Sequence, residues 1–199
     1  MKPKFIVLEG PDSAGKSTQL ELLSLELSRR GIRAIITKEP GGTELGKALR
    51  KLVLSPGRKV VPLAELFIML ADRAQHVEEL IRPALSSGTW VISSRYTLSS
   101  LAYQGYGRGL PLDLIRELNR IATGGLVPDH TFLLDIPPEV ALERGRMGDR
   151  LEREGLEFLR RVREAYLELI KEVPNSHVID ATRSPEEICQ KMLELLGLA

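Results

Sequence analysis

Cysteine is almost missing from this chain of 199 residues, as are long apolar runs and any marked excess of charge. Because Cys189 is the single cysteine, no internal disulfide can form, and we expect a reducing, cytoplasmic environment. The longest strictly apolar run, residues 66–71, is far shorter than the roughly 20 residues that a membrane helix needs. Lysine plus arginine exceed aspartate plus glutamate by only 28 to 27. These absences predict a protein whose partners are neither membranes nor nucleic acids.

Short β-rich runs alternate along the chain with longer segments of helical spacing. The runs are residues 5–9, 32–37, 89–93, 131–135 and 177–180. Helical patterns cover residues 63–85, 112–121, 157–170 and 185–196, and Leu20, Leu23 and Leu27 indicate another helix before Gly31. This alternation predicts one α/β domain, residues 1–199, in which a parallel sheet lies between helices. Ligands of such sheets bind at the carboxyl ends of the strands, which directs attention to the residues that follow each run.

The segment from Gly10 to Ser17 matches the phosphate-loop pattern G-x-x-x-x-G-K-[S/T], between a predicted strand and a predicted helix. Backbone N–H groups of such a loop turn inward around phosphate oxygens, and the helix that follows adds the positive end of its dipole. Lys16 can reach the β- and γ-phosphates, and the Ser17 hydroxyl can bind Mg²⁺. The residues expected at the triphosphate are Gly10, Ser13, Ala14, Gly15, Lys16, Ser17 and Thr18.

The phosphate loop does not by itself define the reaction. The chain has no Asn-Lys-x-Asp motif of the kind that binds guanine, and it is short for a motor or transporter. Small proteins with this loop are often kinases of small molecules, so we expect a second phosphate site.

Charged side chains follow the second run and interrupt the long helical pattern. Lys38 and Glu39 would reach the ligand edge of the sheet, although the Pro-Gly-Gly sequence beside them is equally typical of a plain turn. In the helical pattern, we interpret Asp72, Gln75 and His76 as a solvated face and Arg73 as a ligand-binding residue.

Tyrosines gather after the third run, where Tyr96, Tyr103 and Tyr106 fall close together with Gln104. Their rings and polar groups suit a base and a sugar, and the alternative is a turn that packs on the core. Further along, residues 143–153 contain four arginines and two glycines. Such a segment suits a mobile lid over phosphates, at about residues 144–153, and the alternative is a solvated corner between helices.

In their order and spacing, these motifs resemble the thymidylate kinase (dTMP kinase) family over essentially the whole chain. The most specific segments are residues 10–18, 39–43, 71–76, 95–105 and 149–150. The resemblance implies a nucleoside-monophosphate-kinase-like fold of three layers with a five-stranded parallel sheet, ATP with Mg²⁺ as phosphoryl donor, dTMP as acceptor, and a homodimer.

The resemblance also assigns roles to individual residues. Asp12 would meet the sugar hydroxyl of the acceptor or the magnesium shell, together with Ser17. Arg73 and Arg95 would hold the acceptor phosphate, and Tyr103 would disfavour a ribose 2′-OH. The residues implied at the acceptor are Glu39, Pro40, Met69, Arg73, Arg95, Ser100, Tyr103 and Gln104.

On the donor side, the resemblance places the loop 180–183, with Arg183, beside the adenine. One branch of the family has an arginine after the phosphate-loop acid, where this chain has Ser13. The chain is therefore similar to the other branch, in which a lid arginine serves instead. Arg150 is the expected catalytic arginine, and Arg146 an expected contact of ATP.

The chain departs from the family pattern at three positions, Lys38, Met69 and Ser94, which replace an arginine, a stacking phenylalanine and an aspartate. A flexible thioether at position 69 leaves open a kinase for another nucleoside monophosphate. The serine leaves open a nucleotide-binding regulatory protein with weakened catalysis.

Overall fold

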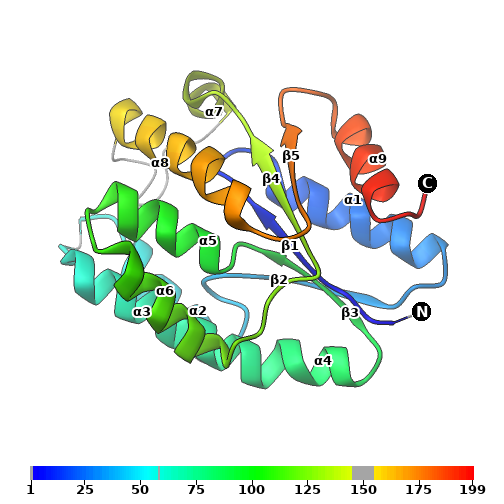
Figure 1. Ribbon diagram of the computed structural model, residues 1–199, viewed down its shortest axis with the longest axis horizontal. Coiled ribbons are helices and arrows are strands. Elements are labelled where there is room, and N and C mark those ends of the chain that lie inside the picture. Colours follow the sequence, from blue (N-terminus) through cyan, green and yellow to red (C-terminus); the bar gives the residue numbers. More distant parts are fainter. Residues whose placement is uncertain (1, 58, 145–154) are drawn as a thin grey trace.

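Five parallel strands form the central sheet, in the order β2-β3-β1-β4-β5 (Figure 1). The computed structural model describes residues 2–57, 59–144 and 155–199. The strands are β1 (Phe5–Glu9), β2 (Ala34–Lys38), β3 (Trp90–Ser94), β4 (His130–Asp135) and β5 (Ser176–Asp180). Each predicted run is confirmed as a strand to within two residues. Because all strands point the same way, their carboxyl ends share one edge.

Helices cover both faces of the sheet. They are α1 (Lys16–Arg29), α2 (Glu44–Leu54), α3 (Pro62–His76), α4 (Arg82–Ser86), α5 (Thr97–Ser100), α6 (Leu112–Thr123), α7 (Pro138–Arg144), α8 (Leu156–Leu169) and α9 (Pro185–Leu195), with π-helical segments η1 (Val77–Ile81) and η2 (Leu101–Gly107) and a 3-10 turn η4 (Ile170–Glu172). The predicted three-layer fold is therefore confirmed (Figure 1).

Alternate residues of the strands divide the apolar core between the two faces. Ile6 and Leu8 of β1 pack with leucines of α1 and with α9. Phe5 and Val7 of the same strand point to the other face, where they meet η1. This two-residue period is what a strand buried on both faces requires.

The long helical pattern at residues 63–85 is confirmed as one run, in which α3, η1 and α4 follow without a break. Two helical segments had not been predicted: α2, and α5 with η2. The side chain of Thr43 begins α2, since its Oγ1 accepts a hydrogen bond from Gly46 N at 3.0 Å. The unpredicted α2 and η2 both contribute to the cavity described below.

Most of the predicted lid, residues 145–153, lies outside the described residues. Arg144, the last described residue before it, donates from Nη1 to Ala181 O at 2.8 Å. None of the helices that the structure describes has the length and apolar character needed to cross a membrane.

Candidate active site

The phosphate loop leaves β1 at Gly10, which has a φ of 137°. A Cβ on this residue would lie 2.5 Å from Leu134 O on β4, so the backbone can pass here only as glycine. The loop then enters α1 at Lys16, after Gly15 with a φ of 89°. The predicted loop is thus confirmed between a strand and the amino terminus of a helix, where the helix dipole is positive.

The Lys16 ammonium lies inside this loop. Its Nζ donates to Gly10 O at 2.9 Å and to Pro11 O at 2.6 Å. Burial lowers the pKa of Lys16 to about 7, and the positive charge of Arg95 acts in the same direction. A triphosphate bound in the loop would favour the charged form of the ammonium, because it brings negative charge to a poorly solvated cation.

Arg95 turns back from the end of β3 over the phosphate loop. Its φ of 71° lies in the left-handed region, which is uncommon for a residue with a side chain and is often found at functional sites. The guanidinium donates to Asp12 Oδ1 at 2.6 Å, to Gly10 O at 3.1 Å and to Tyr103 Oη at 3.2 Å. It also lies over the Tyr103 ring, 4.9 Å from the centroid.

Asp12 is the acidic partner of Arg95 and also accepts a hydrogen bond from Tyr103 Oη at 2.9 Å. Burial alone would raise the pKa of this carboxyl, but the positive charges of Arg95 and Lys16 outweigh it and hold the pKa at about 2. Asp12 is therefore a carboxylate at neutral pH.

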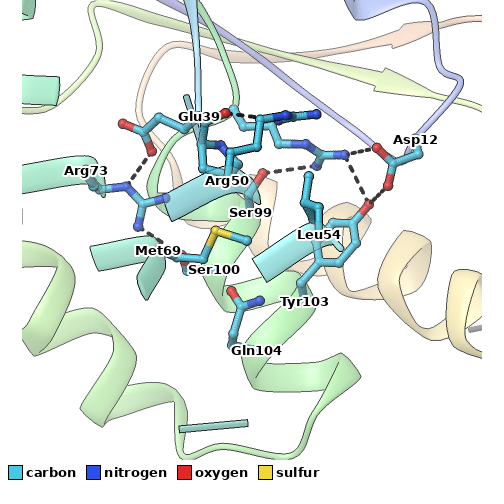
Figure 2. Close-up of a pocket in the computed structure, with 12 residues that line it drawn as sticks. Asp12, Glu39, Arg50, Leu54, Met69, Arg73, Ser99, Ser100, Tyr103 and Gln104 are labelled. Atoms are coloured by element: carbon cyan, nitrogen blue, oxygen red, sulfur yellow. Dashed lines mark hydrogen bonds and ion pairs between the residues drawn. The ribbon is translucent and has the colours of Figure 1, made fainter. Parts of the chain in front are cut away.

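A cavity opens beside this ion pair (Figure 2). It is lined by residues of the phosphate loop, of the segments that directly follow β2 and β3, and of α2, α3, α5 and η2. Its lining contains Asp12 and each of the predicted acceptor residues: Glu39, Pro40, Met69, Arg73, Arg95, Ser100, Tyr103 and Gln104. Three further lining residues had not been predicted from the sequence, Arg50 and Leu54 on α2 and Ser99 on α5. The first two belong to a helix that had not been predicted.

Arg73 is buried beside the cavity, and most of its N–H groups already donate hydrogen bonds to other residues of the protein. Its Nε donates to Glu39 Oε2 at 2.7 Å. Its Nη atoms donate to Ser100 Oγ at 2.9 Å, Asn119 Oδ1 at 2.5 Å and Tyr96 O at 2.8 Å. These bonds involve four of the five N–H groups of a guanidinium and fix its orientation. The expected role of Arg73 at the acceptor phosphate stays a prediction.

The interpretation of Asp72 and His76 as a solvated face is wrong, because both side chains are completely buried. His76 bonds to Thr37 Oγ1 at 2.7 Å and to Glu39 Oε1 at 3.0 Å. A buried chain of polar groups thus runs from Thr37 on β2 through His76 and Glu39 to Arg73. Gln75, by contrast, lies at the surface and donates to Glu79 Oε2 at 2.6 Å.

Asp72 holds the turn that follows β2. Its Oδ1 accepts from Gly41 N at 2.9 Å. Burial and the nearby negative charge of Glu39 raise the pKa of Asp72 to about 6. The turn carries Glu39 and Pro40 into the cavity lining, so the Pro-Gly-Gly sequence is both a turn and part of the site.

The tyrosines that follow β3 separate into different roles. Tyr103 lines the cavity as expected. Tyr96 instead packs in the core, with its ring 5.0 Å from that of Phe5 and its Oη bonded to Leu126 O at 3.1 Å. Tyr106 packs against the apolar cluster of α8. For Tyr96 and Tyr106, the structure therefore favours the alternative, in which the turn packs on the core.

Three residues expected at ATP lie away from this cavity or outside the described residues. Arg183 is exposed on the loop after β5, with its guanidinium 3.7 Å from carboxylate oxygens of Asp180 and Glu187. Arg146 and Arg150 lie outside the described ranges, so the structure gives no position for them.

Oxygen ligands suited to Mg²⁺ are present at the start of α1. The Ser17 hydroxyl is exposed, and the ionised Asp12 belongs to the same loop. Among the residues that the structure describes, no three His, Cys, Asp or Glu side chains form a metal-binding group. This donor set fits a hard cation held largely by phosphates and water, as Mg²⁺ usually is in nucleotide sites.

Comparison with known proteins agrees with this geometry. The family model described as thymidylate kinase matches residues 8–192. A thymidylate kinase of Carboxydothermus hydrogenoformans is 53% identical over 191 residues, which cover 94% of each chain. Thymidylate kinases of Synechococcus sp. (strain JA-3-3Ab) and Halothermothrix orenii are 52% and 50% identical and also align with 94% of this chain. With a phosphate loop opening on a cavity that contains the motif residues, and with these relatives, the chain belongs to the thymidylate kinase family.

Proposed function

We propose that this protein transfers the γ-phosphoryl group of ATP to dTMP, giving dTDP and ADP, as a step of nucleotide synthesis in the cytoplasm. The observation that carries the proposal is the contact between Asp12 of the phosphate loop and Arg95, both of which line the cavity. In this proposal, the contact joins the triphosphate site to a second, arginine-lined site. A kinase of small phosphorylated acceptors needs this arrangement.

In the reaction, an oxygen of the dTMP phosphate forms a bond to the γ-phosphorus, and the bond between that phosphorus and the bridging oxygen of ADP breaks. The protein aligns the two nucleotides and offsets their negative charge. Lys16 and the backbone N–H groups of the loop act on the donor side. Mg²⁺, held by Ser17, Asp12 and the phosphates, would supply further positive charge there. Arg150 and Arg146 remain donor-side candidates on the sequence alone.

On the acceptor side, Arg95 meets the phosphate, and Arg73 adds a second fixed positive charge. Tyr103 stands beside Asp12, where its ring and hydroxyl leave little room for a ribose 2′-OH. Ser100, Gln104 and Met69 line the part of the cavity that receives the base.

Product analysis tests this proposal. Incubation with ATP, Mg²⁺ and dTMP should yield dTDP and ADP in equal amounts, resolved by ion-exchange chromatography. Without dTMP, ADP should form much more slowly. Formation of ADP and free phosphate at the same rate with and without dTMP would mean that the protein is an ATPase.

Ser94 is the position where the weakened-catalysis alternative can be examined. It ends β3, half-buried between Leu8 and Lys38 of the neighbouring strands. The nearby Glu9 cannot take the place of an aspartate here, because its carboxylate is buried and accepts bonds from Tyr96 N, Ser99 Oγ and Tyr166 Oη.

Ser94→Asp is therefore expected to raise kcat by about tenfold, since ~1.4 kcal/mol of transition-state stabilisation suffices and a carboxylate beside Arg95 can hold a metal-bound water. Steady-state kinetics at saturating Mg²⁺ measure the effect. Ser94→Asn is the matched neutral control and should not raise kcat. An unchanged or lower kcat in the aspartate variant would show that serine is no catalytic deficit.

The proposal includes a homodimer, supported by exposed apolar side chains on adjacent helices. Leu63 and Phe67 lie one turn apart on α3, and α2, which packs beside α3, exposes Leu45 and Leu52. Exposed apolar groups that gather on one face are typical of an interface.

Sedimentation equilibrium is expected to give about twice the chain mass of 22.1 kDa for the wild type and a mass near 22.1 kDa for Phe67→Glu. Val178→Glu, an equally exposed apolar position on β5, is the control and should remain dimeric. A monomeric wild type, or a dimeric Phe67→Glu, would contradict this interface.

A further inference from the structure

Glu65 is a buried carboxylate that has no role in the reaction as proposed above. It lies on α3 with none of its surface exposed. Its Oε1 accepts a hydrogen bond from Gln104 Nε2 at 2.7 Å. Its Oε2 lies 3.4 Å from Arg108 Nη2, which forms an ion pair with it. A charge is rarely buried without such partners, because its desolvation is costly.

This contact determines which way the Gln104 amide faces. A carboxylate only accepts hydrogen bonds, so the amide atom beside Glu65 must be the nitrogen. Reversal of the amide would bring Gln104 Oε1 against the carboxylate oxygen, with no proton between two acceptors. The amide of a glutamine is usually ambiguous, but here the chemistry of its partner removes the ambiguity.

The oxygen of the Gln104 amide can accept a hydrogen bond from a ligand. Gln104 lines the cavity, and Figure 2 shows its amide directed toward the other lining side chains. Within the described residues, no side chain or backbone group donates to Gln104 Oε1. The second N–H of Nε2 is not needed by Glu65. The amide thus presents an acceptor and a donor to the base.

We propose that Glu65 is a positioning residue that fixes Gln104 with its oxygen as the acceptor, and so makes the cavity select bases that carry a ring N–H beside a carbonyl. Thymine and uracil have this pattern at N3–H and the adjoining carbonyl oxygen. Cytosine has the reverse pattern, an acceptor at N3 beside an amino donor. It would need the amide orientation that Glu65 excludes. The inference rests on the proposed function and deepens it. It explains how the cavity discriminates between pyrimidine bases, which the flexible Met69 side chain does not.

The test compares kcat/KM for dTMP, dUMP and dCMP in the wild type and in Glu65→Gln. In the variant, either amide orientation can pair with residue 65. The preference for dTMP over dCMP should therefore fall by at least about tenfold, or ~1.4 kcal/mol. The preference for dTMP over dUMP should change by less than about twofold, because both bases keep N3–H. A merely structural role would lower all three values together.

Glu79→Gln is a matched control, because Glu79 also accepts a hydrogen bond from a glutamine amide, Gln75 Nε2, but at the surface. It should leave both preferences, for dTMP over dCMP and for dTMP over dUMP, unchanged. If Glu65→Gln does not fold, Gln104→Met decides the question, since removal of the amide should lower the preference over dCMP to the same extent.

An unchanged ratio of dTMP to dCMP in a folded Glu65→Gln protein, or in Gln104→Met, would overturn the inference. A wild type that does not phosphorylate dTMP would instead overturn the proposed function. The two failures are therefore distinguishable.

Discussion

Lys16→Ala is expected to lower kcat for dTDP formation by at least about a hundredfold, the usual cost of removing one preorganised donor to a charge that develops in the transition state. The Lys16 ammonium already lies inside the phosphate loop, bonded to Gly10 O and Pro11 O. It therefore needs little rearrangement to reach the transferring group. The measurement is steady-state turnover with saturating ATP and dTMP.

The variant should remain folded. Burial lowers the pKa of Lys16 to about 7, below its ordinary value of 10.5, so the unfolded chain binds this proton more tightly than the folded one. The charged lysine therefore disfavours folding most at and below about pH 7, and this cost is lost as the pH rises toward 10.5. Alanine should not lower the melting temperature at neutral pH. Lys191→Ala, at an exposed ion pair on α9, is the control and should keep full activity. If Lys16→Ala retained more than a few per cent of wild-type turnover, Lys16 would not have the proposed role in phosphoryl transfer.

Arg95→Ala is expected to lower kcat/KM for dTMP by about a hundredfold or more, while KM for ATP changes much less, because the proposed contact of Arg95 is with the acceptor phosphate. The melting temperature should also fall, since Asp12 and Tyr103 each lose a partner. Arg95→Lys should recover only part of the activity, because an ammonium cannot form the bidentate contact that a guanidinium forms with phosphate oxygens.

Arg163→Ala is a suitable comparison for Arg95→Ala. Arg163 also forms a partly buried ion pair with an aspartate, Asp135, at 2.7 Å, but it does not line the cavity. Its loss should affect stability without changing kcat/KM for dTMP. An equal loss of affinity for ATP and dTMP in Arg95→Ala would indicate that Arg95 only supports the phosphate loop.

The sheet and the phosphate loop could be predicted from the sequence because both are defined by local patterns. Strands buried on two faces are short apolar runs, and the loop has a fixed spacing of glycine, lysine and serine. Helix α2 was missed although a signal was present. Thr43 is a favourable first residue for a helix, and its cap is seen in the structure.

The buried polar groups could not be predicted in the same way. His76 and Asp72 have helical neighbours that suggest a surface, yet their partners Thr37, Glu39 and Gly41 lie more than thirty positions earlier in the chain. Likewise, nothing near Glu65 in the sequence indicates Gln104, which α3 and η2 bring together only in the folded protein. Long-range pairing of polar groups determined the parts of the site that local patterns missed.

Turnover with a panel of nucleoside monophosphates tests the central claim most directly. With ATP and Mg²⁺ held at saturation, ADP formation would be followed for dTMP, dUMP, dCMP, dAMP and dGMP. The account predicts the highest kcat/KM for dTMP, with dUMP ahead of dCMP and little activity with the purines. Highest activity with dCMP or a purine nucleotide, or no activity with any acceptor, would contradict it.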